Sequence, residues 1–268
     1  MTDRYAVIGH PVAHSKSPWI HAEFARATRQ DLAYERIEAP LGGFAGAVDA
    51  FRAAGGRGCN VTLPFKGDAF RYCGAGASVC AAAAEAVNTL LFDGTQVRGD
   101  NTDGVGLLRD LVANLGRPVE GRAILLVGAG GAAQGVIGPL LEARPRRLVV
   151  VNRTADKALA LARRFGASAG GGLADFRGER FDLVVNATSA GLGAGDAAPI
   201  EASAFAPGAL AYDMVYGRDT AFLALARAAG AAVADGSGML VEQAAESFYL
   251  WRGVRPDTAP VLAALRAR

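Results

Sequence analysis

The stretch AILLVGAGGAA, at Ala123–Ala133, decides the fold. Five apolar residues, typical of a buried strand, lead directly into a glycine-rich turn and then into a helical pattern. Gly128, Gly130 and Ala133 occupy the G-x-G-x-x-G/A positions, in which the glycines allow a tight turn and a close approach to a pyrophosphate. The N-terminus of the following helix favours phosphate. We therefore predict a dinucleotide site at this turn, which consists of Gly128, Ala129, Gly130, Gly131, Ala132 and Ala133.

The residues after the next strand indicate which dinucleotide binds. A site for NAD places Asp or Glu there, to accept a hydrogen bond from the ribose 2′-hydroxyl. This chain instead has Asn152, Arg153 and Thr154, with Lys157 one helical turn later. Two cations without a carboxylate suit a 2′-phosphate, so we predict NADP. An ordinary helix capped by Thr154, with a solvated arginine, is also compatible with these residues, and such a helix could present the same cations to the phosphate.

Short apolar runs alternate with amphipathic stretches along the whole chain. Strands are predicted at Tyr5–Ile8, Leu32–Ile37, Gly58–Thr62, Val87–Phe92, Ala123–Val127, Leu148–Val151, Leu183–Asn186 and Ala209–Met214. Helical spacing lies between most of them, as at Val136–Leu141 and Ala155–Phe165. This alternation is typical of βαβ units and of parallel sheets with helices on both faces, so the predicted class is α/β.

Two domains are expected from the length of 268 residues. GDNTDGVG, at Gly99–Gly106, suggests the boundary and precedes a helix predicted at Leu107–Leu115. Gly238–Trp251 has the apolar spacing of a helix with a broad buried face, but its periodicity does not identify the domain that it contacts. GLGAGDAAP, at Gly191–Pro199, predicts a flexible surface loop.

Composition excludes several classes of protein. The chain is 51% apolar and 20% charged, which favours a folded globular protein over a disordered one. Its formal charge of +2 argues against a nucleic-acid partner, and no apolar stretch is long enough to span a membrane. Three cysteines without C-x-x-C spacing fit a reducing compartment rather than a disulfide framework. With no secretory signal visible, we expect a cytoplasmic protein.

The few lysines and histidines limit the candidates for acid–base chemistry. Lys16, Lys66 and Lys157 are the only lysines among 28 basic residues, and the three histidines lie within the first 21 residues. Pro11 between His10 and His14 makes a shared helix and a metal site there unexpected. A lysine paired with a carboxylate could instead transfer the proton that accompanies hydride exchange. Lys66 and Asp103 are the natural candidates, although an isolated lysine is usually a surface residue.

Polar motifs in the first hundred residues supply further candidates. HSKSP places Ser15 and Ser17 at a predicted helix start that would suit a carboxylate, although Ser17 could act only as the helix cap. NVTLPFK puts Asn60 and Thr62 on one face of a strand end, with Lys66 in the first turn of the next helix. Asn88 lies in an apolar run, where a buried amide requires hydrogen-bond partners.

Taken together, these motifs resemble the shikimate dehydrogenase family along nearly the whole chain. They occur in the order HSKSP, NVTLPFK, AVNT, GDNTDG, GAGGAA, NRT, NATSAG, YDMVY and GMLVEQAAESFYLWRG. The resemblance implies an N-terminal substrate domain of residues 1–103 and 238–268, to which the C-terminal helices return. It also implies a Rossmann-type NADP domain of residues 104–237. The implied reaction is the reversible NADPH-dependent reduction of 3-dehydroshikimate to shikimate, on the route to aromatic amino acids.

The resemblance also assigns roles to residues. Lys66 and Asp103 match the family's catalytic pair, and Ser15 and Ser17 match the residues that hold the substrate carboxylate. Further substrate contacts fall on Thr62, Asn88, Tyr216 and Gln243, and the nicotinamide end of NADP falls near Met214 and Gly236. The implied ligands are small molecules, without a metal, and the protein would be a monomer or a homodimer.

Three other interpretations remain open from the sequence. A quinate/shikimate dehydrogenase could use NAD or both cofactors, although Asn152–Thr154 speaks against this. A sensor that binds NADP without catalysis would have no need of Lys66 and Asp103. A purely structural scaffold would have no reason to keep so many polar residues in one site.

Overall fold

The computed structural model describes residues 2–188 and 197–268, which form two compact units. The first unit consists of residues 1–106 and 241–268, and the second of residues 107–240. From the sequence, the first domain was expected to end at Asp103 and to resume at Gly238; the first unit of the structure ends at Gly106 and resumes at Val241. Residues 191–196 of the predicted surface loop lie outside the described residues. Within the described residues, no helix is both long and apolar enough to cross a membrane.

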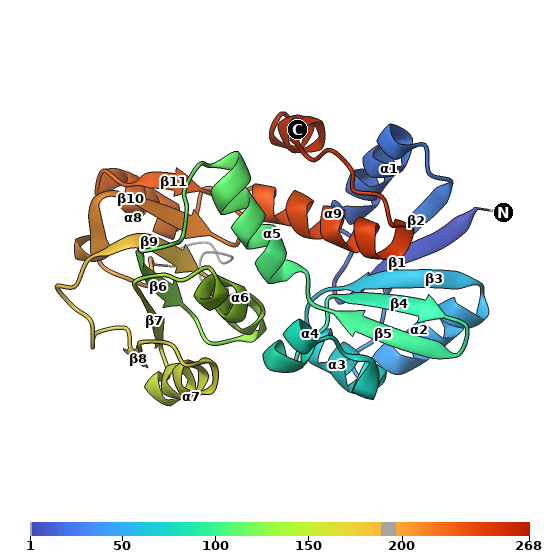
Figure 1. Ribbon diagram of the computed structural model, residues 1–268, viewed down its shortest axis with the longest axis horizontal. Helices are drawn as coiled ribbons and strands as arrows, with labels where there is room; N and C mark the ends of the chain where they lie inside the picture. The colour runs from blue at the N-terminus through green and yellow to red at the C-terminus, as the bar shows by residue number, and fades with distance from the viewer. Residues whose placement is uncertain (1, 189–196) are drawn as a thin grey trace. The chain divides into compact units, whose positions relative to one another are not determined.

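The first unit is built on a five-stranded sheet in the order β2-β1-β3-β4-β5 (Figure 1). The strands are β1 (Asp3–Gly9), β2 (Leu32–Glu38), β3 (Gly56–Val61), β4 (Thr89–Asp93) and β5 (Gln96–Asp100). β1 pairs in parallel with β2 and β3, whereas β4 runs antiparallel to both β3 and β5. The sheet is therefore mixed, and its parallel strands end where loops carry the predicted site residues.

Helices cover both faces of this sheet. The helices are α1 (Ser17–Thr28), α2 (Phe44–Ala53), α3 (Lys66–Cys73), α4 (Val79–Ala84), the later part of α9 (Ser237–Arg252) and α10 (Ala259–Arg266). Because side chains alternate along a strand, Ala6 and Ile8 of β1 enter the core that is shared with α2 and α3. Tyr5 points to the other face and stacks on Trp251 of α9, with 4.6 Å between the ring centroids. Residues 241–268, which include α10 and most of α9, therefore belong to the first unit.

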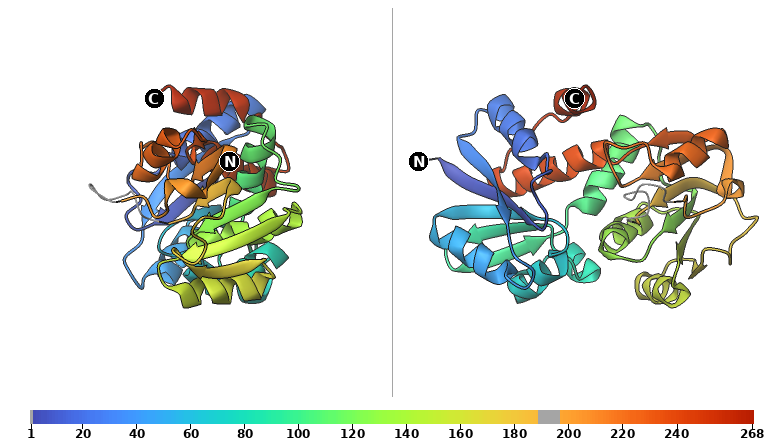
Figure 2. Two further views of the ribbon diagram at one scale, coloured as in Figure 1. Left: turned by 90° about the vertical axis from the view of Figure 1, so that its left-hand side faces the viewer. Right: turned by 180° about the vertical axis from the view of Figure 1, so that it is seen from behind.

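The second unit is a six-stranded, fully parallel sheet in the order β11-β10-β9-β6-β7-β8. Its strands are β6 (Ala123–Val127), β7 (Arg147–Asn152), β8 (Ala169–Gly172), β9 (Phe181–Asn186), β10 (Phe205–Asp213) and β11 (Ala232–Ala234). Helices α6 (Gly131–Glu142) and α7 (Ala155–Phe165) pack on one face, and α8 (Ala221–Ala228) packs on the other (Figure 2). The predicted α/β class is confirmed.

Several elements differ from the sequence-based prediction. Strand β5 was not predicted because its sequence is mostly polar, β8 because three of its four residues are glycine, and β11 because it has only three residues. The helix expected at Leu107–Leu115 begins earlier, as α5 (Asp103–Arg109), and continues as a π-helical turn at Asp110–Asn114. Asp103 is therefore the first residue of a helix rather than part of the preceding turn. Asn88 lies just before β4 and not within it.

His21 lies in an aromatic cluster between α1, β2 and α9. It is completely buried, and its ring stacks on Tyr34 with 4.3 Å between the centroids and 6° between the planes. Phe248 and Trp251 pack around the same ring. Burial disfavours the charged form and lowers the pKa of His21 to about 3, outweighing the opposite effect of the Asn60 amide. His21 is thus neutral in the folded protein at mildly acidic pH, whereas the unfolded chain binds a proton below about pH 6.5.

This difference predicts a specific loss of stability in acid. Between pH 7 and pH 4.5 the unfolded state gains a proton at His21 that the folded state does not, so stability falls as pH falls. We expect His21→Phe to remove about 2.5 kcal/mol of this loss, measured by urea unfolding at both pH values. His14→Gln, at an exposed histidine, is the control and should follow the wild type. If His21→Phe also follows the wild type, His21 is not held neutral by burial.

Candidate active site and cofactor cavity

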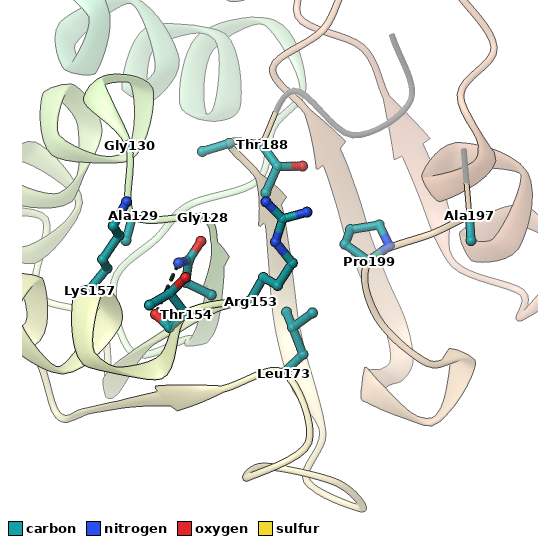
Figure 3. Close-up of a pocket in the computed structure, with 12 residues that line it drawn as sticks. Gly128, Ala129, Gly130, Arg153, Thr154, Lys157, Leu173, Thr188, Ala197 and Pro199 are labelled. Atoms are coloured by element: carbon teal, nitrogen blue, oxygen red, sulfur yellow. Dashed lines mark hydrogen bonds between the residues drawn. The ribbon is translucent and has the colours of Figure 1, made fainter. Parts of the chain in front are cut away.

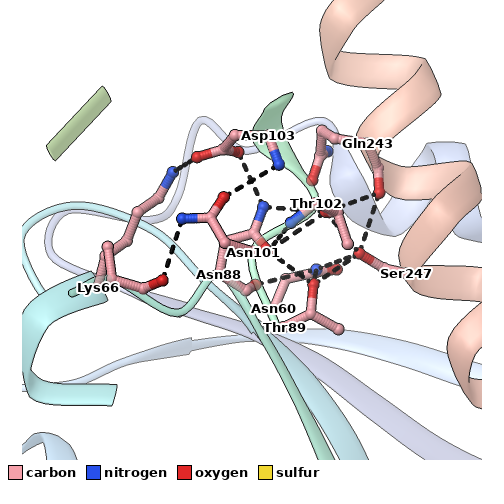
Figure 4. A network of polar contacts seen from close by, with 10 residues as sticks. Asn60, Lys66, Asn88, Thr89, Asn101, Thr102, Asp103, Gln243 and Ser247 are labelled. Carbon is pink, nitrogen blue, oxygen red and sulfur yellow. Dashed lines mark hydrogen bonds and ion pairs between the residues drawn. The ribbon is translucent and has the colours of Figure 1, made fainter. Parts of the chain in front are cut away.

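Lys66 and Asp103 come together at the carboxyl end of β3 (Figure 4). Lys66 opens α3, as the sequence predicted, and Asp103 opens α5. The Lys66 Nζ donates to Asp103 Oδ2 at 2.5 Å, and the two side chains are 20% and 7% exposed. The lysine therefore reaches solvent at one edge while the carboxylate is buried. Such a pair can exchange a proton with a group bound beside it.

Asn88 holds the second oxygen of the Asp103 carboxylate. Its Nδ2 donates to Asp103 Oδ1 at 2.8 Å, while its Oδ1 accepts the backbone N–H of Thr102 at 2.9 Å. Because a backbone N–H can only donate, this second bond fixes which end of the amide faces Thr102. The amide hydrogens must then point toward Asp103. The predicted Asn88 thus has both ends satisfied, as a buried amide requires.

Asn101, which the sequence showed only as part of a polar turn, fixes the backbone at Asp103. Its Oδ1 accepts the Asp103 N–H at 3.1 Å, and its Nδ2 donates to the carbonyl of Ala86 at 3.0 Å. One side chain therefore ties the start of α5 to the segment that leads to Asn88. Its place in the polar segment GDNTDG, ahead of a predicted helix, was the available signal.

A layer of buried polar side chains lies next to this pair. Asn60 of β3 donates to Thr89 and to Ser247, and its Oδ1 accepts from the Tyr34 hydroxyl at 2.7 Å. The Thr102 hydroxyl donates within the same layer, to Gln243 O or to Asn88 Oδ1. Gln243 therefore joins the site through its backbone carbonyl. Thr89, Thr102 and Ser247 were not identified from the sequence, because their contacts are long-range.

The serines of HSKSP lie at the start of α1. Ser15 and Ser17 are both buried, and the Ser17 N–H donates to the Ser15 hydroxyl at 3.3 Å. Ser17 is the first residue of α1, so the expectation that it could be the helix cap is wrong. Instead, the Ser15 side chain turns back toward the helix, and its hydroxyl oxygen accepts the Ser17 N–H. Arg36 donates twice to the Ser15 carbonyl, at 3.1 and 2.6 Å, which fixes this loop. Thr62, half-buried, follows directly after β3.

In the second unit, a cavity of about 620 Å³ opens at the carboxyl ends of the parallel strands (Figure 3). It is lined by Gly128, Ala129, Gly130, Asn152, Arg153, Thr154, Lys157, Leu173, Ala187, Thr188, Ala197 and Pro199. Seven of these are predicted cofactor residues, and the others come from segments after β8 and β9 and from the residues before β10. The cavity lies beside β6, whose two neighbours in the sheet are β7 and β9, the position at which doubly wound sheets bind ligands.

The shape and charge of the cavity fit NADP. A Cβ added at Gly130 would meet no atom within 4 Å, so the backbone there is open to a pyrophosphate. Gly128, by contrast, is required by its own backbone: its φ is +115°, and a Cβ would lie 3.0 Å from the Ala187 carbonyl. Arg153 and Lys157 are exposed cations in the lining, which suits a 2′-phosphate. Gly131 and Ala132 form the first turn of α6 and are not in the lining.

Asp213 joins the end of β9 to the segment between β10 and α8. This buried carboxylate accepts from Asn186 Nδ2 at 3.2 Å, the Val215 N–H at 3.0 Å and the Thr220 hydroxyl at 2.6 Å. Burial raises the pKa of Asp213, and the three donors oppose that rise. Asn186 also accepts from Thr188, which lines the cavity. Asp213 thus braces a wall that the sequence indicated only as the motifs NATSAG and YDMVY.

The remaining predicted residues lie near this wall but not in it. Met214 follows β10, and its carbonyl would lie 2.3 Å from a Cβ at Gly236, so the two residues are adjacent. Neither lines the cavity. Tyr216 also belongs to the second unit, apart from the other predicted substrate residues, and burial raises the pKa of its hydroxyl.

Three family models match successive parts of the chain. The shikimate dehydrogenase substrate binding domain matches residues 7–90, the shikimate/quinate 5-dehydrogenase model matches residues 110–206, and the shikimate 5′-dehydrogenase C-terminal domain matches residues 236–266.

Relatives match over the full length. Shikimate dehydrogenase (NADP⁺) from Dechloromonas aromatica is 58% identical, over 100% of this chain and 99% of its own. The enzyme of the same name from Aromatoleum aromaticum is also 58% identical, over 98% and 97%. The crystal structure of shikimate 5-dehydrogenase from Thermus thermophilus, in complex with NADP(H) and shikimate, superposes with a TM-score of 0.90 at 39% identity and covers 99% of both chains.

Two glycines of the cavity provide a matched test of its architecture. Gly128→Ala should destabilise the protein by about 1–3 kcal/mol, because it strains a positive-φ position beside the Ala187 carbonyl. Gly130→Ala should leave stability unchanged, since its backbone is extended and the added methyl meets no atom. That methyl should nevertheless weaken NADPH binding about tenfold or more by overpacking the phosphate path. Urea unfolding and fluorescence titration measure the two effects. Wild-type NADPH affinity in Gly130→Ala would contradict the assigned path.

Proposed function

Because this chain belongs to the shikimate dehydrogenase family, we propose that it reversibly reduces 3-dehydroshikimate to shikimate with NADPH. The observation that carries this proposal is the contact between Lys66 and Asp103 at the edge of the first unit's sheet. It supplies a proton-exchanging pair among amide and hydroxyl side chains, which suit a polyhydroxylated ring. The cytoplasmic location and the monomeric or dimeric state stay predictions from the sequence.

The substrate would be held by the first unit. Ser15 and Ser17, at the N-terminal end of α1, would bind the carboxylate with their hydroxyls, aided by the partial positive charge of the helix end. Thr62, Asn88 and Gln243 would bind ring hydroxyls, and Tyr216, which belongs to the second unit, stays a substrate contact implied by the family resemblance alone. These polar contacts select a substrate that carries both a carboxylate and hydroxyl groups.

NADP would be held by the second unit. The turn at Gly128–Gly130 and the start of α6 would bind the pyrophosphate, and Asn152, Arg153, Thr154 and Lys157 would surround the adenosine 2′-phosphate. Met214 and Gly236 would lie toward the nicotinamide end. When bound, the cofactor supplies the hydride for reduction and takes it back in the reverse direction.

Lys66 and Asp103 would carry out the proton transfer. As the carbonyl carbon of 3-dehydroshikimate receives the hydride, its oxygen must take one proton to become the hydroxyl of shikimate. Lys66, whose Nζ lies 2.5 Å from Asp103 Oδ2, would give this proton to the oxygen. Asp103 keeps the ammonium in place and compensates its charge, and Asn88 keeps the carboxylate oriented. In the oxidation of shikimate the same pair receives the proton.

The alternatives predict different cofactor and substrate preferences. A quinate/shikimate dehydrogenase with dual cofactor use would oxidise quinate and accept NAD. The cations at Arg153 and Lys157 and the names of the relatives favour NADP. A sensor without catalysis would bind NADP and turn over neither substrate. A scaffold would bind neither ligand.

An absorbance assay at the reduced-nicotinamide band separates these possibilities. Purified protein is supplied with shikimate or quinate and with NADP or NAD, in all four combinations. We expect rapid turnover with shikimate and NADP alone. Equal or better activity with quinate or NAD would overturn the specificity, and no turnover in a folded protein that binds NADP would favour the sensor.

Replacing Lys66 should mainly affect the chemical step. We expect Lys66→Ala to lower kcat for shikimate by about a hundredfold or more while changing KM much less, because general acid–base groups contribute about 10²–10⁴-fold. Steady-state kinetics with saturating NADP measure both constants. Arg71→Ala, at an exposed residue of the same helix, is the control and should retain wild-type kcat. A change confined to KM in Lys66→Ala would remove Lys66 from the proton transfer.

Replacing Arg153 should change the choice of cofactor. Loss of a charge-assisted hydrogen bond costs about 1.5–3 kcal/mol, which corresponds to about a tenfold to hundredfold rise in KM for NADP. KM for NAD should hardly change in Arg153→Ala, because NAD lacks the 2′-phosphate. Arg163→Ala removes an exposed cation of α7 outside the cavity lining and should leave both constants unchanged. An equal rise for both cofactors would show that Arg153 does not bind the 2′-phosphate.

A further inference from the structure

Ser247 of α9 occupies the centre of the buried polar layer behind Asp103 (Figure 4). Its side chain is completely buried, although a small polar residue on a helix is usually exposed. The hydroxyl accepts from Asn60 Nδ2 at 2.9 Å and donates to the Gln243 carbonyl at 3.0 Å. It also lies 2.8 Å from the Thr89 hydroxyl and 3.3 Å from that of Thr102. One oxygen therefore joins β3, β4, the start of α5 and α9.

The number of hydroxyl protons in this layer links the Ser247 hydroxyl indirectly to the Asp103 carboxylate. Thr89, Thr102 and Ser247 bring one hydroxyl proton each, and the shared acceptors are the Gln243 carbonyl and Asn88 Oδ1. When Ser247 donates to Gln243, the hydroxyl protons of Thr89 and Thr102 are both available for Asn88 Oδ1, at 2.9 and 3.2 Å. Together with the Thr102 N–H they use that oxygen fully as an acceptor, which keeps the amide hydrogens of Asn88 directed at Asp103 Oδ1 and at the Thr102 hydroxyl oxygen.

A close approach of two helices holds this arrangement in place. A Cβ on Gly106 of α5 would lie 2.7 Å from both the backbone nitrogen and the Cβ of Gln243. Only a glycine lets α5 come this near to α9. The Ser247 hydroxyl donates to the Gln243 carbonyl at the same place. The position of Gln243 relative to Asp103 is therefore set by backbone contact and by this hydroxyl together.

We propose that Ser247 is a positioning residue for catalysis, which orients Asn88 and thereby the Asp103 carboxylate while seating Gln243. The inference rests on the proposed function, since it assigns Ser247 a part in the chemistry of the Lys66–Asp103 pair. Ser247 touches neither member of that pair and acts only through Asn88, Thr102 and Gln243. It is not needed to hold NADP, whose predicted residues lie in the second unit.

Ser247→Ala tests this role by removing one oxygen. Asn60 keeps the Asn88 carbonyl and Thr89 as acceptors, so the fold should survive. We expect kcat for shikimate to fall about threefold to tenfold, the range for one net hydrogen bond, with an unchanged Kd for NADPH. Ala245→Gly, at a buried residue of the same helix that brings no side-chain polar atom, is the matched control. It should lower the melting temperature without lowering kcat.

A double-mutant cycle and a crystal structure make the test independent of stability. Thr102→Val removes the partner hydroxyl, so its effect on kcat should be less than multiplicative with that of Ser247→Ala. In crystals of Ser247→Ala, the Asn88 Nδ2 to Asp103 Oδ1 distance of 2.8 Å should lengthen beyond hydrogen-bonding range or become heterogeneous.

Two results would overturn the proposal. One is wild-type kcat in Ser247→Ala, and the other is an unaltered Asn88–Asp103 contact in its crystal structure. A failure of the proposed function looks different: the wild-type enzyme itself would not turn over shikimate, and the crystal structure would still decide whether Ser247 orients Asn88.

Discussion

The ion pair between Lys66 and Asp103 is the interaction on which the site depends. A buried carboxylate is costly unless charge and hydrogen bonds compensate it, and here both oxygens are used, one by Lys66 and one by Asn88. The fold meets this requirement by bringing three chain segments to one edge of the sheet: the end of β3, the residues before β4 and the start of α5. Asn101 then locks the backbone between the last two. Loss of Lys66 would leave the carboxylate charge without compensation, and loss of Asn88 would leave one of its oxygens without its hydrogen bond.

The second unit also uses its sheet to bring separate chain segments to one site. Its parallel strands end together, so the Gly128 turn, the Arg153 segment and the Thr188 loop all face one cavity. Asp213 has a role like that of Asn88 in the first unit: its buried side chain accepts hydrogen bonds from several chain segments and holds them in place. In both units a rigid sheet carries the loops, and buried hydrogen bonds fix their geometry before any ligand binds.

The local sequence pattern was enough to predict some helices and strands but not others. Ala123–Val127 and Ala155–Phe165 were predicted with the observed bounds, because a buried parallel strand and a strongly amphipathic helix carry clear signals. Strand β5, at Gln96–Asp100, is polar and pairs antiparallel at a sheet edge, so no apolar run marked it. The predicted pair of Lys66 and Asp103 came from residue type and motif. Ser247 could not be found that way, because Asn60 and Thr89, its partners, are more than 150 residues away.

The central claim is that Lys66 and Asp103 bracket the reacting hydroxyl of the substrate. A crystal structure of the protein with shikimate and NADP bound tests it most directly. The account predicts that one ring hydroxyl lies within about 3.2 Å of both Lys66 Nζ and an Asp103 carboxylate oxygen, with the substrate carboxylate on Ser15 and Ser17. A shikimate molecule bound elsewhere in the first unit, or turned so that its carboxylate meets Lys66, would contradict it.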